Sequence, residues 1–308
     1  MNAASLLGPA ACLGSAALWA LSANVYARAA RVSSPMAVNL LRASLSLPCF
    51  LAAALVMGPA GGLGQVTAGR AGWLLLSVVG SYVVGDALFL ASAQVLGVPA
   101  ALAISSIYPI WSALAGWVFM GQNVGVAGLL GVLLVVAGVV TVVRRRGEDV
   151  ETEGPADGFR NRLGYTRGVL LAGATSFFWA LNTFAIARGG ADLPVAAVNT
   201  FRMGFAVALL PLARLLLRGR GTTLVVPAAE IRRSWPFFLL ESVGGTALFV
   251  VGLTHSPLAV AAALTSLAPV LSVPFALAIG GERLRPRVLA GIAVVTTGIV
   301  LLVGFGKP

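Results

Sequence analysis

Four charged side chains interrupt long apolar stretches of the chain, and each needs a chemical reason to be there. They are two cations, Arg42 and Arg202, and two carboxylates, Asp86 and Glu241. A charge inside a membrane-spanning helix costs at least about 2.5–3.5 kcal/mol on insertion scales. A guanidinium can bind a carboxylate or a phosphate through two parallel hydrogen bonds, whereas a carboxylate can bind an amine or carry a proton. These residues therefore indicate either a polar substrate site or a set of internal ion pairs.

The two arginines occur in the same local pattern. Asn39 precedes Arg42 by three positions and Asn199 precedes Arg202 by three, so each pair occupies one helical face. Such pairs either line a central cavity or tie neighbouring helix ends together. Because a substrate rarely contacts two copies of a site identically, we assign Asn39, Arg42, Asn199 and Arg202 to structural polar pairs.

The carboxylates and several uncharged side chains are the candidates for contact with a substrate. Asp86 or Glu241 could hold a substrate amine or a coupling proton, or could instead neutralise the arginines. Aromatic and amide side chains accompany them, although most aromatic residues in membrane spans only pack or anchor the helix. The candidate substrate or cavity residues are Trp19, Asn24, Tyr82, Asp86, Tyr108, Trp179, Asn182 and Glu241.

The composition excludes several classes of protein. Of the 308 residues, 58% are hydrophobic and 10% are charged, against roughly 25% charged residues in a soluble domain. A water-soluble enzyme, a disordered protein and a disulfide scaffold are therefore excluded. The net charge of +11 does not indicate nucleic acid, because the arginines cluster between apolar runs as topology signals do. No motif for a catalytic residue, a metal or a cofactor is present, and we expect none.

The apolar runs predict an all-α integral membrane protein. A transmembrane helix needs about 20 predominantly apolar residues, and Gly, Pro and Arg mark the breaks between runs. The predicted spans are 6–27, 36–57, 73–94, 98–120, 123–143, 167–187, 194–217, 234–255, 258–280 and 286–305. Residues 144–166 form a hydrophilic linker, so the chain divides into 1–143, 144–166 and 167–308. Pro109 and Pro269 predict a break in the fourth and ninth spans.

The two sets of five spans repeat each other. A shift of 160 residues aligns identical residues of uncommon types: Trp19 with Trp179, Asn39 with Asn199, Arg42 with Arg202, and Pro109 with Pro269. Shared apolar composition would match Ala, Leu and Val, but it would not match these. Because five is an odd number, the second copy must cross the membrane in the opposite sense. Inverted repeats of this kind are typical of secondary transporters with a substrate site near the midplane.

Several segments of the first half also resemble a known family. They are W-A-L-S-A-N-V-Y-A-R-A (19–29), V-N-L-L-R-A-S (38–44), G-D-A-L-F-L-A-S-A-Q-V-L (85–96) and S-S-I-Y-P-I-W-S-A-L (105–114). The second half repeats the series and adds G-G-E-R-L at 280–284, where the first half has Gly121-Gln122-Asn123. The chain thus resembles the EamA-type transporters of the drug/metabolite transporter superfamily. That resemblance implies ten helices in two inverted five-helix repeats, and export or exchange of small metabolites.

We therefore expect a secondary transporter of the plasma or inner membrane that exports amino acids or related small metabolites by alternating access. The alternatives are a multidrug or other metabolite permease of the same superfamily and, in a different class, a membrane-embedded lipid-active enzyme. The expected partners are a small-molecule substrate, the lipid bilayer, a coupling proton and a second copy of the chain, with no nucleic acid.

Two expectations concern geometry. The cavity walls are predicted to come from helices one, three, four, six, eight and nine, with helices five and ten at the periphery. Loops assigned alternately to two sides carry 16 and 3 of the 21 Lys and Arg residues, with Arg42 and Arg202 inside spans. The positive-inside rule then places linker 144–166 in the cytoplasm and both termini outside. The resemblance implies the reverse orientation, since members of that family are usually drawn with both termini inside.

Overall fold

The chain folds as a bundle of long helices. In the computed structural model the described residues are 3–121, 125–126, 130–131, 133–134, 137–138, 155–216, 223–269, 271 and 286–305, and no strand occurs among them. Seven helical segments of this part of the chain are long and apolar enough to cross a membrane. The all-α, multi-pass membrane fold that the composition predicts is thereby confirmed.

The first half begins with two uninterrupted helices followed by two interrupted ones. Ser34 caps the second helix by accepting a hydrogen bond from the Ala37 amide at 3.0 Å, and Pro35 occupies its first turn. Gly121, with φ of 66°, ends the last of these helices in a left-handed conformation. The elements are α1 (Ala3–Val32), α2 (Pro35–Val56), η1 (Gly58–Gly61), η2 (Leu63–Gln65), α3 (Ala68–Val78), η3 (Val79–Val83), α4 (Gly85–Leu96), α5 (Val98–Ser105) and α6 (Tyr108–Met120).

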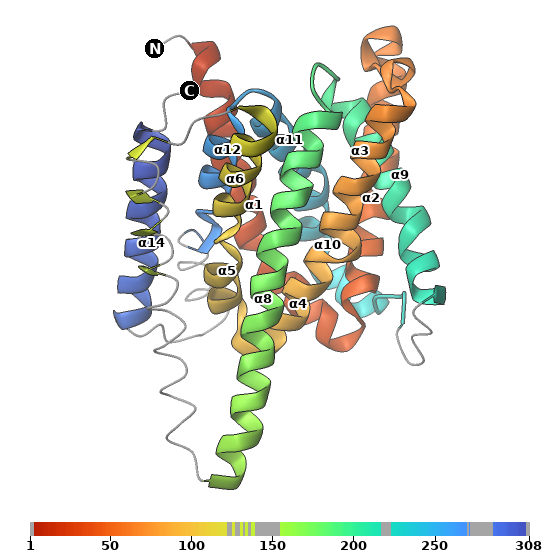
Figure 1. The fold of residues 1–308 in the computed structure, drawn as a ribbon. Coiled ribbons are helices and arrows are strands. Elements are labelled where there is room, and N and C mark those ends of the chain that lie inside the picture. Colours follow the sequence, from red (N-terminus) through yellow and green to blue (C-terminus); the bar gives the residue numbers. More distant parts are fainter. Residues whose placement is uncertain are drawn as a thin grey trace.

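The second half follows the same order of long and interrupted helices. Its elements are α8 (Pro155–Gly189), α9 (Val195–Leu216), α10 (Ala228–Leu239), η4 (Leu240–Gly245), α11 (Thr246–Thr254), α12 (Leu258–Thr265) and α14 (Pro286–Phe305). Because α8 begins at Pro155, residues 155–166 of the predicted linker are helical, and α8 extends beyond the other helices at the bottom of Figure 1. The predicted span 123–143 and the second part of span 258–280 lie largely outside the described residues.

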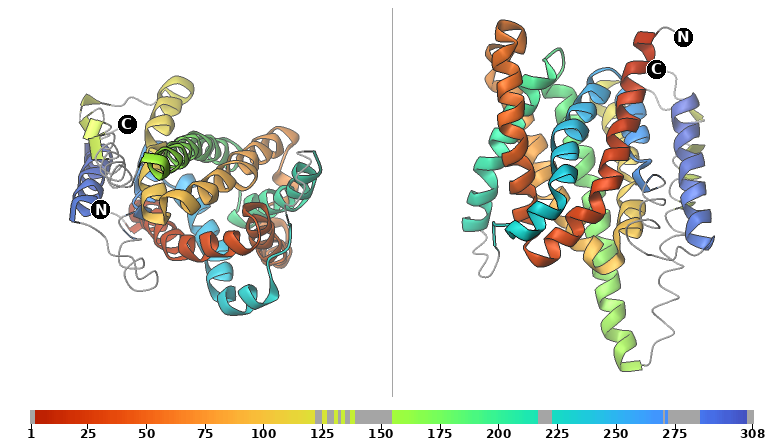
Figure 2. Two further views of the ribbon diagram at one scale, coloured as in Figure 1. Left: turned by 90° about the horizontal axis from the view of Figure 1, so that it is seen from below. Right: turned by 180° about the vertical axis from the view of Figure 1, so that it is seen from behind.

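Helices that the 160-residue offset pairs run in opposite directions. Helix α1 descends in Figure 1, whereas its equivalent α8 ascends beside the middle of the bundle. Helices α2 and α9 form a second such pair and pack directly against each other. The views from below and from behind show the helices of both halves intermingled in one bundle (Figure 2).

The interruptions occur at equivalent places in the two halves. The π-helical turn η3 separates α3 from α4, and the π-helical turn η4 separates α10 from α11. The fourth span breaks at residues 106–107, just before Pro109, and the ninth breaks at residues 266–267, just before Pro269. The breaks that the prolines predicted are present. Such breaks are tolerated inside a membrane where the freed backbone faces protein or a cavity.

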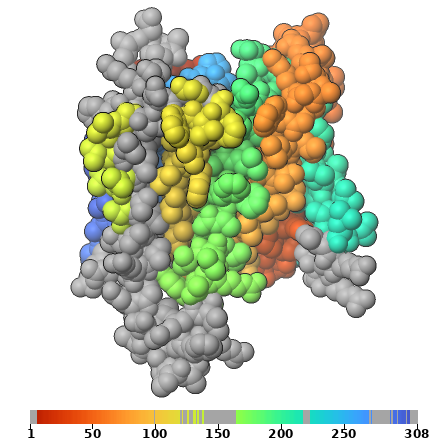
Figure 3. Space-filling model, viewed as in Figure 1, coloured from red at the N-terminus to blue at the C-terminus, as the bar shows by residue number. Residues whose placement is uncertain are grey.

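The outside of the bundle is apolar. Helices α6, α8 and α3 lie side by side on the face shown in Figure 3. Large apolar side chains on α6 and α8 are exposed, including Phe119 at 66% and Leu170 at 68%. A soluble protein rarely exposes apolar side chains in this way over a continuous face, so this surface is expected to contact lipid.

Candidate functional site

Arg42 forms ion pairs with both Asp86 and Glu241. The Arg42 guanidinium donates from Nη1 to Asp86 Oδ2 at 2.6 Å and from Nε to Glu241 Oε2 at 3.2 Å, and its Nη2 donates to Glu241 Oε1 at 3.3 Å. All three side chains are at least nine-tenths buried. Asp86 belongs to α4, whereas Glu241 belongs to η4 in the second half of the chain. The ion-pair cluster Arg42–Asp86–Glu241 therefore joins the two halves.

Hydrogen-bond donors and aromatic rings enclose this cluster. Trp179 Nε1 donates to Asp86 Oδ1 at 2.9 Å, and the Tyr26 hydroxyl donates to Glu241 Oε2 at 2.8 Å. The guanidinium carbon of Arg42 lies 5.1 Å from the Trp19 ring centroid and 4.8 Å from that of Tyr26. The Tyr82 ring lies at 4.8 Å as well. Cation–π contacts of this kind strengthen when water is excluded.

The second arginine has a different environment. Arg202 Nε donates to the Ser77 hydroxyl at 3.0 Å, Nη1 to Asn199 Oδ1 at 3.2 Å and Nη2 to Asn182 Oδ1 at 3.1 Å. Arg202 is 2% exposed. Within the described part of the chain, no carboxylate oxygen lies within 4.0 Å of an Arg202 nitrogen, which is the distance limit for an ion pair. Arg202 is thus a buried cation held by neutral acceptors alone.

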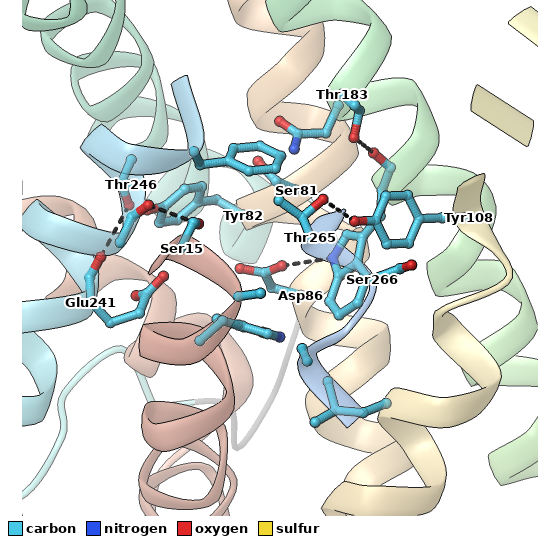
Figure 4. Close-up of a pocket in the computed structure, with 18 of the residues that line it drawn as sticks. Ser15, Ser81, Tyr82, Asp86, Tyr108, Thr183, Glu241, Thr246, Thr265 and Ser266 are labelled. Carbon is cyan, nitrogen blue, oxygen red and sulfur yellow. Dashed lines mark hydrogen bonds between the residues drawn. The ribbon is translucent and has the colours of Figure 1, made fainter. Parts of the chain in front are cut away.

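Both arginines border one cavity of about 110 Å³ at the centre of the bundle. Figure 4 shows part of its wall, with Asp86 at the centre and Tyr108 hydrogen-bonded to Thr265 beside it. Hydroxyl, aromatic, charged and amide side chains share this wall. The lining residues are Ser15, Ala16, Trp19, Arg42, Ser81, Tyr82, Asp86, Leu102, Ser106, Tyr108, Trp179, Asn182, Thr183, Arg202, Glu241, Gly245, Thr246, Phe249, Thr265, Ser266 and Ala268.

Small residues allow the wall to close around Asp86. A Cβ added to Gly85 would lie 2.3 Å from the Gly80 carbonyl oxygen and 2.9 Å from the Trp179 ring. Only glycine permits this approach, which brings the Trp179 indole within reach of the Asp86 carboxylate. The neighbouring π-helical turn η3 supplies the Gly80 carbonyl.

Most of the candidate residues meet at this cavity. Trp19, Tyr82, Asp86, Tyr108, Trp179, Asn182 and Glu241 all line it, and Asn24 does not. Arg42 and Arg202 line it too, whereas Asn39 and Asn199 stand behind them and accept hydrogen bonds from their guanidinium groups.

Sequence reasoning missed several contributors. Tyr26 and Ser77 bind the charged side chains, and Thr265 binds Tyr108. A polar residue one or two turns from an intramembrane charge is the only signal that could have found Tyr26, and it is weak. The predicted set of wall helices was also too small, because Arg42 of α2 and Arg202 of α9 add the second and seventh spans.

The described residues form a bundle of membrane-length helices around a cavity that both halves of the chain line, an arrangement typical of membrane transport proteins. The EamA-like transporter family matches residues 6–144 and 166–304, and the chain belongs to that family. The family is part of the drug/metabolite transporter superfamily, so the resemblance seen in the sequence is confirmed.

Individual relatives agree with this assignment. An uncharacterized transporter of Archaeoglobus fulgidus is 27% identical over 291 residues, which cover 94% of this chain and 95% of the relative. The pseudopaline exporter CntI of Pseudomonas aeruginosa is 31% identical over 140 residues, which cover 44% of this chain and 46% of that protein. A crystal structure with 19% sequence identity superposes with a TM-score of 0.69 and covers 100% of this chain and 99% of its own, which shows a shared fold.

Proposed function

We propose that the chain is a secondary transporter that exports amino acids or related small metabolites by alternating access. The observation that carries this proposal is the cavity with charged and hydroxyl side chains in its wall, which comes from both halves of the chain. A site near the midplane between two halves can be exposed to either side in turn when the halves rock against each other.

The proposed architecture is ten spans in two inverted five-helix repeats, divided as 1–143, 144–166 and 167–308. Contacts between equivalent residues support it. The Ser106 hydroxyl donates to the Ser266 carbonyl at 3.1 Å, and the Trp19 and Trp179 rings meet edge to face at 5.8 Å. Residues 160 positions apart touch each other when they lie on the axis that relates two copies. The opposite directions of α1 and α8 and the two matched segments of the family agree with the same arrangement.

The chemistry of the cavity supports a small polar substrate. Its wall carries both signs of charge together with Trp, Tyr and hydroxyl groups. The partial relative CntI is named as an exporter, which supports export as the direction. Asp86 and Glu241 are the groups proposed to carry a coupling proton, because they are the carboxylates at the cavity. A homodimer through the fifth and tenth spans is a further part of the proposal.

Counterflow in proteoliposomes tests the proposed function. Purified protein is screened for thermal stabilisation by amino acids, amines and purines, and the stabilising compounds are loaded unlabelled into the vesicles. Labelled compound added outside is expected to accumulate transiently above its equilibrium level, because exchange through an alternating-access site couples the two fluxes. Empty liposomes and vesicles without internal substrate are the controls.

Two outcomes contradict the proposal. Uptake that proceeds to equilibrium with no dependence on internal substrate indicates a passive channel. Absence of uptake and exchange for every compound class excludes transport of these metabolites.

A further inference from the structure

The two arginines occupy equivalent positions in the repeats, but Arg42 is bound by carboxylates and Arg202 by neutral oxygens. Asp86 and Glu241 bind Arg42. The 160-residue offset places Thr246 at the position of Asp86 and Ser81 at the position of Glu241. The repeat therefore has hydroxyl groups on the Arg202 side at the positions that hold carboxylates on the Arg42 side. Both hydroxyl residues line the same cavity.

These hydroxyl groups bring no negative charge to Arg202. The Ser81 hydroxyl donates to the Ser77 carbonyl at 2.8 Å, and the Thr246 hydroxyl donates to the Glu241 carbonyl at 3.4 Å. Arg202 makes three hydrogen bonds, all to neutral oxygens, although a guanidinium has five N–H donors. A buried cation without an anion is unfavourable unless a partner arrives. Arg202 therefore has both unused N–H donors and an uncompensated positive charge at the cavity.

A second buried group at the cavity also lacks a partner. The Tyr82 hydroxyl is buried and makes no hydrogen bond to any described residue. Tyr82 is 2% exposed and lines the cavity together with Arg202. Buried hydroxyl groups are nearly always hydrogen-bonded, so this one points to a ligand. The Tyr82 ring packs against Arg42, and Tyr82 shares the cavity wall with Arg202. A Tyr hydroxyl and a guanidinium that line one cavity can both donate to a carboxylate.

The Arg42 cluster in the same cavity wall carries negative charge. Arg42 with its two carboxylates has a formal charge of −1, and Arg202 has +1. Asp86 Oδ1 and Oδ2 and Glu241 Oε1 each accept one hydrogen bond from the protein, and a carboxylate oxygen can accept two. These oxygens therefore keep unused capacity to accept hydrogen bonds from an ammonium group.

We infer that the cavity binds a zwitterion in a fixed orientation, with the carboxylate on Arg202 and the Tyr82 hydroxyl and the ammonium toward Asp86 and Glu241. This inference rests on the proposed transport function and names its substrate class and its carboxylate-binding residues. Trp19, Tyr108 and Phe249 also line the cavity, and they are the residues proposed to contact the side chain of the amino acid. A cation alone would leave Arg202 unpaired, and an anion alone would leave the Arg42 cluster uncompensated.

Binding measurements on the purified full-length chain test the inference. The probes are the 20 standard L-amino acids and, for each one that binds, its α-carboxamide and its des-amino carboxylic acid. The unsubstituted protein is expected to bind the zwitterion at least about tenfold more tightly than either analogue, because each analogue leaves either Arg202 or the Arg42 cluster uncompensated. Equal affinity for the zwitterion and the carboxamide contradicts the role of Arg202.

Two variants assign the carboxylate contact to its residues. Tyr82→Phe removes one hydroxyl, and Arg202→Gln removes the positive charge. Both are expected to weaken binding of the zwitterion about tenfold or more and to leave binding of the carboxamide within about twofold. Tyr165→Phe, which removes a Tyr hydroxyl outside the cavity, is the matched control. If Arg202→Gln fails to fold, Tyr82→Phe still decides the question, and a loss equal for both ligands overturns the inference.

The result is distinguishable from a failure of the proposed function. If no amino acid binds while amines or purines show counterflow, transport stands and the zwitterion site is wrong. If no compound of any class is exchanged, the proposed function fails first.

Discussion

At the residue scale, Arg42 is the partner of both carboxylates that line the cavity. Its removal would leave Asp86 and Glu241 buried without a cation. We expect Arg42→Ala to destabilise the protein by about 3–5 kcal/mol, as the loss of one partner from a buried ion pair does. The measurements are the yield of monodisperse protein on size-exclusion chromatography and its melting temperature.

A more exposed ion pair provides the comparison for that experiment. Arg28 binds Glu230 at 2.8 Å, and their side chains are 37% and 13% exposed. Arg28→Ala is expected to cost less than Arg42→Ala, because water reaches this pair and solvates the carboxylate that is left. An Arg42→Ala protein that expresses and melts like the unsubstituted chain would show that the cluster does not hold the fold together.

Sequence reasoning predicted the right charges but not their pairing. Two arginines and two acids allow one partner each, and the sequence left open which arginine each acid would bind. The structure brings both acids to Arg42, since α4 and η4 converge there from different halves. Such convergence depends on tertiary packing between distant segments, and no local pattern in the sequence records it.

At the element scale, the π-helical turns decide which side chains face the cavity. Ser81 and Asp86 both line it although they are five positions apart, and Glu241 and Thr246 repeat that spacing. In an α-helix of 3.6 residues per turn, two such positions point about 140° apart. A π-helical turn, with its hydrogen bonds between residues five apart, brings them to one face. The Val84 amide makes such a bond to the Val79 carbonyl at 3.1 Å.

These turns could not be predicted from hydropathy. Apolar spacing identified the third and eighth spans, although the predicted spans 73–94 and 234–255 start later than the helical segments Ala68–Leu96 and Ala228–Thr254. The prolines identified the breaks in the fourth and ninth spans. The residues of η3, Val79–Val83, read as ordinary membrane helix. The extra residue of a π-helical turn leaves no pattern in the hydropathy. It can be recognised only in the folded chain, where neighbouring helices hold the side chains before and after the turn.

The glycine in the first π-helical turn should be sensitive to any side chain. A Cβ on Gly80 would lie 2.8 Å from the Phe178 carbonyl oxygen and 2.9 Å from the Asn182 backbone nitrogen, both in α8. We expect Gly80→Ala to lower the melting temperature, because backbone must move to accept the methyl group. The shift should also disturb Asn182, which binds Arg202.

A Gly→Ala substitution at Gly72, also in the third span, is the control. It changes helix propensity in the same way but adds no close contact with another helix. A Cβ on Gly72 meets nothing within 4 Å, and Gly72 is exposed. Gly72→Ala is expected to leave stability unchanged or to raise it by up to about 1 kcal/mol. Equal melting temperatures for the two variants would mean that η3 and α8 do not approach as closely as described.

At the scale of the whole molecule, the repeat is the feature that the sequence revealed best. The offset of 160 residues rests on distinctive residue types, and the equivalent residues Ser106 and Ser266 are in contact. What the repeat could not reveal is the difference between its copies at the cavity. The proposed zwitterion site depends on those departures from symmetry, and only the folded chain shows which of them share the cavity wall.

The arrangement of the helices also fixes which basic residues share a side. The start of α1 and the end of α14 lie at one end of the molecule, and the start of α8 lies at the other (Figure 1). Arg28, at the far end of α1, pairs with Glu230 of α10. Arg70 and the end of α8 meet at the end that holds the termini, since a Cβ on Gly189 would lie 3.1 Å from the Arg70 carbonyl. These contacts agree with the alternating assignment of loops.

The last prediction is the orientation of the protein in its membrane. The side that contains linker 144–166 carries 16 Lys and Arg residues, against 3 on the side of the termini, and positive charge marks the cytoplasmic side. We expect a reporter that fluoresces only in the cytoplasm to be dark when fused after Pro308 and bright when inserted within the linker, with both fusions present in the membrane fraction. The reverse pattern would place both termini inside, as the family is usually drawn. The bias would then reflect a role of the basic loops other than topology, because it is present in both halves of the chain.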